Sequence, residues 1–411
     1  MSKSSVIRSV PLNVTAAGLS IGFALLMAEV AVRAFAPQQL IIPRPDIYIA
    51  VDSLGWKHRP LVNTTVNTGE RTVAFRTDSS GFRVARLGRR ATPRHVLLIG
   101  DSFMAAMQVE YEQSLAGLLD ASLETLRVPA SIDNAGVAGW DPPQYLIQLR
   151  RSLENRRYDA VVASIYVGND VAARFPRRIP PLQPEEVHAF RWPRSARRSE
   201  VVDAWLYPVN DFLKRRSHLY ILAKKQLRAV RMRTGLTAEL LPREILRKDS
   251  TGGAAADTTI LILKEMAGIA QAHHVPIRFF LIPSSYQVDS AELNTVLRGF
   301  KIEPSEVDVN QPNRLLGSRL AAAGLQFTDV TDALRAARQS GERMNGAVDA
   351  HLSPEGHKVF AAVVLPQIMA LLSGEPCPPV QHGRRDCRPA GLLPDARHGV
   401  PAAKPKHAPR G

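Results

Sequence analysis

The amino-acid sequence predicts an α/β protein with a central parallel sheet that is covered by helices. Two observations predict this class. Short apolar runs typical of buried strands alternate along the chain with stretches of helical periodicity. The chain has 411 residues, of which 45% are hydrophobic, enough for one large core with appendages. No internal repeat occurs at the periods typical of solenoid proteins, which argues against a repeat architecture.

The N-terminal segment, residues 1–36, contains an apolar stretch long enough to cross a membrane. Residues 10–28 span roughly 28 Å as a helix, close to the hydrocarbon thickness of a bilayer. Lys3 and Arg8 precede this stretch and favour a cytoplasmic N-terminus. Ala34-Phe35-Ala36 is similar to a signal-peptidase site, but the following Pro37 disfavours cleavage.

We therefore expect a retained signal anchor, with a cleaved signal peptide as the first alternative. In both cases the main domain lies on the outer, periplasmic side of the cytoplasmic membrane, and the anchor makes it a single-pass protein. A buried helix of a soluble protein is the other alternative, because Pro11 and Asn13 weaken the span.

The juxtamembrane segment, residues 37–90, is expected to form short strands. Gly55-Trp56 and Gly81-Phe82-Arg83 each follow an Asp-Ser pair, and the stretch between them is rich in alternating Thr and Val. We expect this segment to pack on the edge of the main domain, and we assign it no chemistry.

A serine follows the first strong strand signal. Residues 95–99 form a buried apolar run, Gly100-Asp101-Ser102 breaks it, and residues 103–123 have the pattern of an amphipathic helix. Ser102 therefore lies at the carboxyl end of a strand and beside a helix N-terminus, where backbone N–H groups point at a developing oxyanion. This arrangement suits a nucleophile, although Gly-Asp-Ser is also a common turn and differs from the Gly-x-Ser-x-Gly elbow.

Two further strand ends carry groups able to donate hydrogen bonds. Residues 130–132 form a short apolar run, and Gly139 lies between it and a helix starting near Pro142, so the Gly139 N–H can face an oxyanion. Residues 160–167 form a core strand, and the Asn169 side chain lies just past its carboxyl end, where open α/β sheets bind ligands. The alternative for each is an ordinary turn. Removing one oxyanion donor typically costs about 10²–10³ in rate.

The remaining strands and the last helix complete the plan. Residues 276–282 follow a helix over 258–273, and residues 325–330 follow a helix over 314–323. A final helix runs from Ser353 to about residue 372. His351 precedes it and can act as general base, with Asp349 holding the other ring nitrogen. His357 falls inside the helix and is expected to be structural or to face solvent.

Taken in order, Ser102, Gly139, Asn169 and His351 resemble the four blocks of the SGNH, or GDSL-type, hydrolases, in membrane-anchored bacterial form. The resemblance covers roughly residues 90–172 and 257–372. It implies a flavodoxin-like three-layer sandwich for residues 91–374 and a reaction that needs no metal or other cofactor. It also implies site roles: a catalytic triad of Ser102, Asp349 and His351, and an oxyanion hole formed by the backbone of Ser102 and Gly139 and the side chain of Asn169.

Two positions depart from the family pattern. The acid commonly lies three residues before the histidine, where this chain has Val348 and carries its acid at Asp349. This makes Asp349 the least secure member of the triad. The third block commonly has its glycine two residues before the asparagine, whereas Gly168 directly precedes Asn169.

An insertion at about residues 173–256 interrupts the hydrolase pattern. It contains a Pro-rich piece at 179–184 and two expected helices, at 201–216 and 219–232, which together suggest a helical cap over the site. Residues 150–250 carry a net charge of +11. No basic motif interleaved with aromatic residues accompanies this charge, so we expect no nucleic-acid partner and favour a solvated face or one near anionic lipid heads.

The tail, residues 375–411, has eight prolines and a net charge of +4 and is expected to be disordered. Cys377 and Cys387 can form a disulfide in an oxidising compartment. His382 lies between them, but this spacing fits no zinc pattern.

Three functions are compatible with this sequence. The first is a serine esterase that cleaves short-chain or acetyl esters through an acyl-enzyme. The second is an O-acyltransferase or O-acetyltransferase, in which a hydroxyl of an envelope polysaccharide replaces water. The third is an idle binding module, against which the four complete blocks argue. The expected partners are an ester or acylated-glycan substrate and the cytoplasmic membrane.

Overall fold

The computed structural model describes residues 4–42, 44–51, 54–86, 92–172, 198–234, 253–300, 302–347 and 350–374. The Pro-rich piece at 179–184, Asp349, and the tail with its two cysteines lie outside these residues.

A five-stranded parallel sheet forms the centre of the protein, in the order β6-β5-β7-β8-β9. Three strands come from the first half of the fold and two from the second: β5 (Arg94–Ile99), β6 (Ala130–Asn134), β7 (Ala160–Tyr166), β8 (Ile277–Ile282) and β9 (Phe327–Asp329). Numbered along the chain, this order is 2-1-3-4-5, the flavodoxin-like arrangement. The predicted α/β class and the predicted strands are confirmed.

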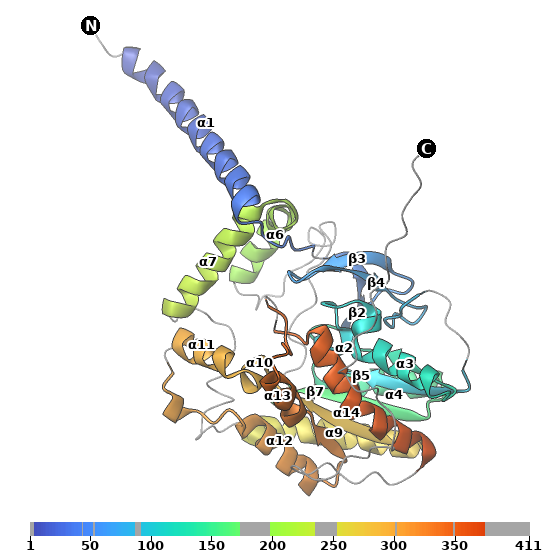
Figure 1. Cartoon of the computed structure of the whole chain (residues 1–411). Helices are drawn as coiled ribbons and strands as arrows, with labels where there is room; N and C mark the ends of the chain where they lie inside the picture. Colours follow the sequence, from blue (N-terminus) through green and yellow to red (C-terminus); the bar gives the residue numbers. More distant parts are fainter. Residues whose placement is uncertain are drawn as a thin grey trace, which may run out of the picture.

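Helices cover both faces of this sheet, because its strands are apolar on both sides. In β5, Leu97 and Ile99 belong to one core cluster, whereas Val96 and Leu98 belong to the other. The first face is covered by α4 (Pro142–Asn155), α9 (Gly253–Ala272) and α12 (Gln311–Ala322). The second is covered by α3 (Leu115–Thr125), α13 (Thr331–Gln339) and α14 (Pro354–Ser373). Figure 1 shows these layers.

The continuous helix predicted over residues 103–123 is wrong. The chain instead forms a single turn of helix, α2 (Ser102–Ala105), then a short 3₁₀ turn, η2 (Tyr111–Gln113), and only then α3. Ala106 adopts a left-handed conformation with φ of 49° and ends α2. The Ser114 hydroxyl accepts a hydrogen bond from the Gly117 N–H and starts α3. The segment between α2 and α3 therefore has the sequence periodicity of a helix, but tertiary contacts hold it in another conformation.

Arg83 supplies the main contact that holds this broken segment. Its side chain is fully buried. One guanidinium nitrogen donates to the carbonyls of Ala105 and Ala106 at 2.8 and 2.5 Å, and the other donates to Val109 at 2.7 Å. The Arg83 backbone N–H also donates to the carbonyl of Asn134 at 3.1 Å. The side chain thus satisfies carbonyls that the early end of α2 leaves without helical partners.

Arg83 follows two antiparallel hairpins. The first pairs β1 (Tyr48–Val51) with β2 (Gly55–His58), and the second pairs β3 (Asn63–Asn67) with β4 (Thr72–Arg76). They share a small core of Ile47, Val66, Val73 and Phe75. Figure 1 shows the hairpins against the main body, with β2 beside α2. These are the short strands predicted between residues 37 and 90. Three later helices were not expected: α10 (Ser285–Val288), α11 (Ser290–Phe300) and α13.

Among the described residues, two helices are long and apolar enough to cross a membrane. The window Val14–Phe35 of α1 (Ser4–Phe35) has a mean hydropathy of 1.8 and none of it is buried. The α14 window has a mean hydropathy of 1.4, but 39% of it is buried because this helix covers the sheet. In Figure 1, α1 stands away from the main body. It is therefore a possible membrane anchor or signal sequence.

The two helices expected in the insertion are α6 (Arg198–Arg216) and α7 (His218–Thr234), and they lie at the base of α1. Glu29 of α1 accepts hydrogen bonds from the Ser217 hydroxyl and from the N–H groups of His218 and Leu219, at 2.8, 2.9 and 2.9 Å. This carboxylate caps the start of α7 and ties α1 to the α6–α7 turn.

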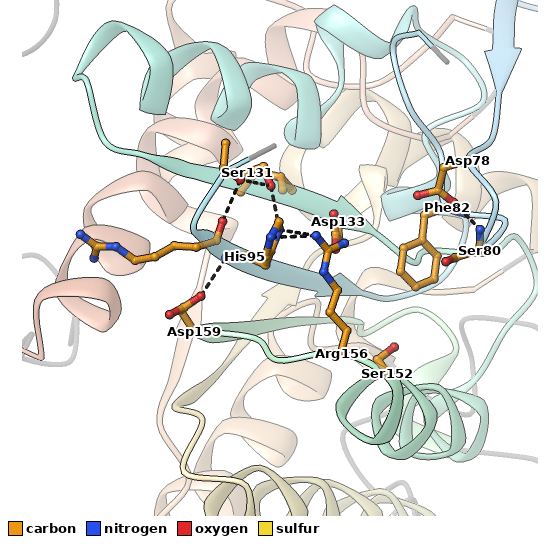
Figure 2. A network of polar contacts seen from close by, with 12 residues as sticks. Asp78, Ser80, Phe82, His95, Ser131, Asp133, Ser152, Arg156 and Asp159 are labelled. Atoms are coloured by element: carbon orange, nitrogen blue, oxygen red, sulfur yellow. Dashed lines mark hydrogen bonds and ion pairs between the residues drawn. The ribbon is translucent and has the colours of Figure 1, made fainter. Parts of the chain in front are cut away.

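Polar side chains fasten the amino ends of the central strands (Figure 2). The His95 N–H at the start of β5 donates to the Asp159 carboxylate at 2.8 Å. The His95 ring contacts the Ser131 hydroxyl at 2.9 Å and the Arg156 guanidinium at 2.7 Å. Arg156 also pairs with the buried Asp133 carboxylate at 2.8 Å. This network joins β5, β6 and β7 at the sheet edge opposite Ser102.

Replacing Arg83 with Met should lower the free energy of unfolding by about 3 kcal/mol or more, because each buried carbonyl left without a partner costs about 1–3 kcal/mol. The free energy of unfolding of Arg83→Lys should lie between those of Arg83→Met and the parent, since one ammonium group cannot reach all three carbonyls. Urea unfolding of the detergent-solubilised protein, followed by tryptophan fluorescence, measures both. A Met variant as stable as the parent would contradict this account of the α2 end.

Candidate active site

Ser102 and His351 are in direct contact. The Ser102 Oγ and the His351 Nε2 lie 2.6 Å apart, although 249 positions separate them in the chain. Ser102 opens α2 just beyond β5, and the preceding Asp101 caps that helix by accepting a hydrogen bond from the Phe103 N–H at 2.9 Å. The serine thus occupies the strand end where the sequence placed it, within reach of a base.

The loop before α14 holds His351 in place. Asn345 and Leu352 form an isolated antiparallel bridge, and the Gly346 N–H donates to the His351 carbonyl at 2.9 Å. The Ser353 hydroxyl caps α14 by accepting from the Gly356 N–H at 3.0 Å. The His351 ring also lies 4.8 Å from the Phe103 ring, centroid to centroid. These contacts orient the imidazole toward the α2 turn.

Gly139 lies on the loop after β6, which is bonded directly to the α2 turn. The Asn134 side-chain amide donates to the Met104 carbonyl at 2.8 Å, and the Val137 N–H donates to the Gly100 carbonyl at 3.1 Å. Gly139 itself is exposed and has φ of 80°, a conformation that favours glycine. No described residue accepts a hydrogen bond from its N–H. The loop thus carries an available donor at the carboxyl edge of the sheet.

Asn169 follows β7, which pairs with β5 in the sheet. Its side chain is half-buried, and its Oδ1 atom is buried without a hydrogen-bond partner in the described part of the chain. Such an unsatisfied atom is costly and is typical of functional positions. Ser102, Gly139 and Asn169 therefore follow three neighbouring parallel strands and share one edge of the sheet.

His357 is a packing residue. Its side chain is fully buried, and its Nδ1 accepts a hydrogen bond from the Leu115 N–H at 3.2 Å. Burial lowers the pKa of His357 to about 3, so it is neutral at physiological pH. Of the two interpretations left open by the sequence, the structural one is confirmed and the solvent-facing one is wrong.

Two buried carboxyl groups flank the site. Burial raises the pKa of Asp101 to about 6, and burial together with repulsion from Asp101 raises the pKa of Asp170 well above its usual value. One Asp170 oxygen accepts hydrogen bonds from the Tyr145 hydroxyl at 3.0 Å and the Tyr166 N–H at 2.9 Å. The protein therefore keeps protons on carboxyls beside the site at mildly acidic pH.

Asp101→Asn should change how stability depends on pH. The folded protein holds a proton on Asp101 between about pH 4 and 6, where the unfolded chain has lost it, so this carboxyl lowers stability as the pH rises through that range. The Asn variant lacks this titration and should gain stability relative to the parent as the pH increases from 4 to 7. Urea unfolding at several pH values measures this, and parallel pH curves for the two proteins would contradict it.

No group of three or more His, Cys, Asp or Glu side chains able to hold a metal ion occurs among the described residues. The groups that the structure places at this sheet edge are a serine, an imidazole, backbone N–H groups and a side-chain amide. They can attack a carbonyl carbon, move a proton and stabilise an oxyanion.

We expected no chemistry from the juxtamembrane segment, but part of it lies against the Gly139 loop. The Trp56 indole N–H donates to the Ala138 carbonyl at 3.0 Å, and the Trp140 indole N–H donates back to the Trp56 carbonyl at 2.8 Å. The two similar Gly-aromatic motifs at Trp56 and Phe82 were the available signal. Nothing in them reveals which distant loop they contact.

No protein-family model matches the chain, and no curated protein is significantly similar to it. Solved structures to which this chain is similar include TesA, which is 14% identical with a TM-score of 0.35 over 68% of this chain and 100% of TesA. A member of the lipolytic protein G-D-S-L family from Veillonella parvula is 12% identical, with a TM-score of 0.33 over 65% of this chain and 94% of that chain. A catalytic mutant of Axe2, an acetylxylan esterase from Geobacillus stearothermophilus, is 11% identical, with a TM-score of 0.36 over 68% and 96%. In its four ordered sequence blocks and in its flavodoxin-like sheet, this chain is similar to the SGNH, or GDSL-type, hydrolases.

Proposed function

We propose that the chain is a serine hydrolase that cleaves carboxylic esters, with short acyl groups such as acetyl as substrates. The observation that carries this proposal is the 2.6 Å contact between the Ser102 Oγ and the His351 Nε2 at the carboxyl edge of a parallel sheet. A hydroxyl in this contact can lose its proton to the imidazole as it attacks a carbonyl carbon.

In the proposed reaction each of these groups has one role. Ser102 forms a bond to the acyl carbon, and His351 takes its proton and passes it to the leaving alcohol. In the second step His351 takes a proton from a water molecule as that water attacks the same carbon. The bond from the carbon to the Ser102 Oγ then breaks, and His351 returns the proton to that oxygen. The N–H groups of Ser102 and Gly139 and the Asn169 amide bind the oxyanion in both steps, and Asp349 orients the imidazole.

An O-acyltransferase of an envelope polysaccharide is the second candidate. The observation that favours it is α1, which is exposed and apolar over Val14–Phe35 and suits a protein held near exported glycans. In that reaction a sugar hydroxyl replaces water in the second step. Acetate released to water supports the esterase, whereas acetate transferred to an added glycan supports the transferase.

The helix α1 serves as a retained anchor that holds the catalytic domain on the periplasmic side. Cleavage after Ala36 would remove Glu29, the residue that caps α7. An uncleaved helix keeps this contact with the α6–α7 turn. The last turn of α6 carries the basic residues Lys214, Arg215 and Arg216, and the Arg33 side chain of α1 donates to the Arg216 carbonyl, so this turn lies beside α1, where its charge suits anionic lipid heads.

Ser102→Ala and His351→Ala should each abolish turnover of p-nitrophenyl acetate by the detergent-solubilised protein, because each removes a group that forms or breaks a bond. His357→Asn is the matched control, since its amide oxygen can replace the Nδ1 atom that accepts from Leu115. It should keep most of the activity. If Ser102→Ala kept most of the activity on this ester, the nucleophile assignment would be wrong.

Asn169→Ala should lower kcat by about 10²–10³ with little change in KM, because the oxyanion exists only in the transition state and the tetrahedral intermediate. Steady-state kinetics on the same ester measure both constants. A change confined to KM would instead place Asn169 in substrate binding.

A further inference from the structure

Trp56 holds the peptide group that carries the proposed Gly139 oxyanion donor. Its side chain is 5% exposed on β2, and its indole N–H donates to the Ala138 carbonyl at 3.0 Å. The ring lies directly beside Gly139, because a Cβ added there would come within 3.1 Å of the Trp56 Cζ2 atom. The contact therefore reaches the Ala138–Gly139 peptide from one side.

The geometry of a peptide bond makes this contact directional. The peptide bonds of the described chain are trans, so the Ala138 carbonyl and the Gly139 N–H point in opposite directions within one plane. A hydrogen bond that draws the carbonyl toward Trp56 therefore turns the N–H away from it. The same bond polarises the peptide and strengthens the N–H as a donor. Gly139 has φ of 80° and lacks a Cβ, so its own conformation restrains the peptide plane only weakly.

Trp56 is itself fastened to the loop that it orients. Its carbonyl accepts from the Trp140 indole N–H at 2.8 Å, and the neighbouring Leu54 carbonyl accepts from the Gln144 side chain at 2.8 Å. Leu54, Trp56 and Trp140 are buried together in the core on the α4 side of the sheet. The apolar packing of Leu54, Trp56 and Trp140 holds the Trp56 indole in place, and Trp140→Phe keeps an aromatic ring in that core.

We propose that Trp56 is a positioning residue that aims the Gly139 N–H at the oxyanion. The proposal rests on the proposed function, because it concerns the stabilisation of an oxyanion formed at Ser102. Trp56 touches neither substrate nor reacting atoms and acts only through the Ala138–Gly139 peptide. The juxtamembrane segment is then part of the catalytic unit and more than a connection to α1.

Trp56→Phe tests this, because it keeps an aromatic ring against Gly139 and removes the indole N–H. The full-length protein in detergent should show a kcat for p-nitrophenyl acetate about tenfold lower with KM unchanged, since a misdirected donor costs less than the 10²–10³ of a lost one. Active-site titration with diethyl p-nitrophenyl phosphate gives the fraction of folded, reactive enzyme. The loss should persist after kcat is divided by this fraction.

Trp140→Phe is the matched control. It also removes one buried indole-to-carbonyl hydrogen bond from the same contact, but that bond ends on the Trp56 carbonyl and does not hold the Ala138–Gly139 peptide. It should keep kcat per titrated site within about twofold of the parent. If both variants lose kcat equally, or if the loss in Trp56→Phe disappears after titration, the role of Trp56 is structural and the proposal fails.

The two proposals can fail separately. A dead Ser102→Ala protein together with an unaffected Trp56→Phe protein would leave the esterase intact and overturn the role of Trp56. An active Ser102→Ala protein would overturn the proposed function first.

Discussion

The buried guanidinium of Arg83 is the interaction on which the rest of the site depends. A serine mounted on a single turn of helix leaves several backbone carbonyls without helical partners inside the protein. Arg83 donates to three of them, those of Ala105, Ala106 and Val109, and its own N–H joins β6 through Asn134. Burial lowers the pKa of Arg83 to about 10, so the group stays charged at neutral pH. The α2 turn thus takes its shape from a side chain outside the central sheet.

The polar side chains at the two edges of the central sheet differ in how fully they are hydrogen-bonded. At the amino edge, charged and hydroxyl groups are paired with one another, as in the contacts of Arg156 with Asp133 and His95. At the carboxyl edge, polar groups keep unused hydrogen-bonding capacity, as in the Asn169 Oδ1, which has no partner among the residues that the structure describes. The paired edge stabilises the strand register, and the open edge is available for chemistry. Because these two polar regions lie at opposite edges, one sheet can have a stabilised strand register at one edge and groups available for chemistry at the other.

Much of the fold was predictable from the sequence, because buried parallel strands and their flanking helices have strong local signals. The strand before Ser102, the strand before Asn169 and the cap of α14 at Ser353 all lie where the sequence placed them. The contact between Ser102 and His351 was expected from the resemblance of the four ordered blocks, because His351 lies in the loop before α14 and follows no strand. The break after α2 did not, because Ala106 has no local tendency to a left-handed conformation and its cause, Arg83, is distant in sequence.

Buried polar side chains were the harder class to predict. A charged residue usually lies at the surface, so the sequence gave no sign that Arg83 is fully buried, and for His357 it left a structural and a solvent-facing position open. Nothing in the sequence indicates that the Trp56 indole donates a hydrogen bond to the Ala138 carbonyl. In each case the role comes from a hydrogen bond to backbone that is remote in sequence. Such bonds carry no periodicity, and they hold loops of the candidate site, so the site could be located from the sequence but its support could not.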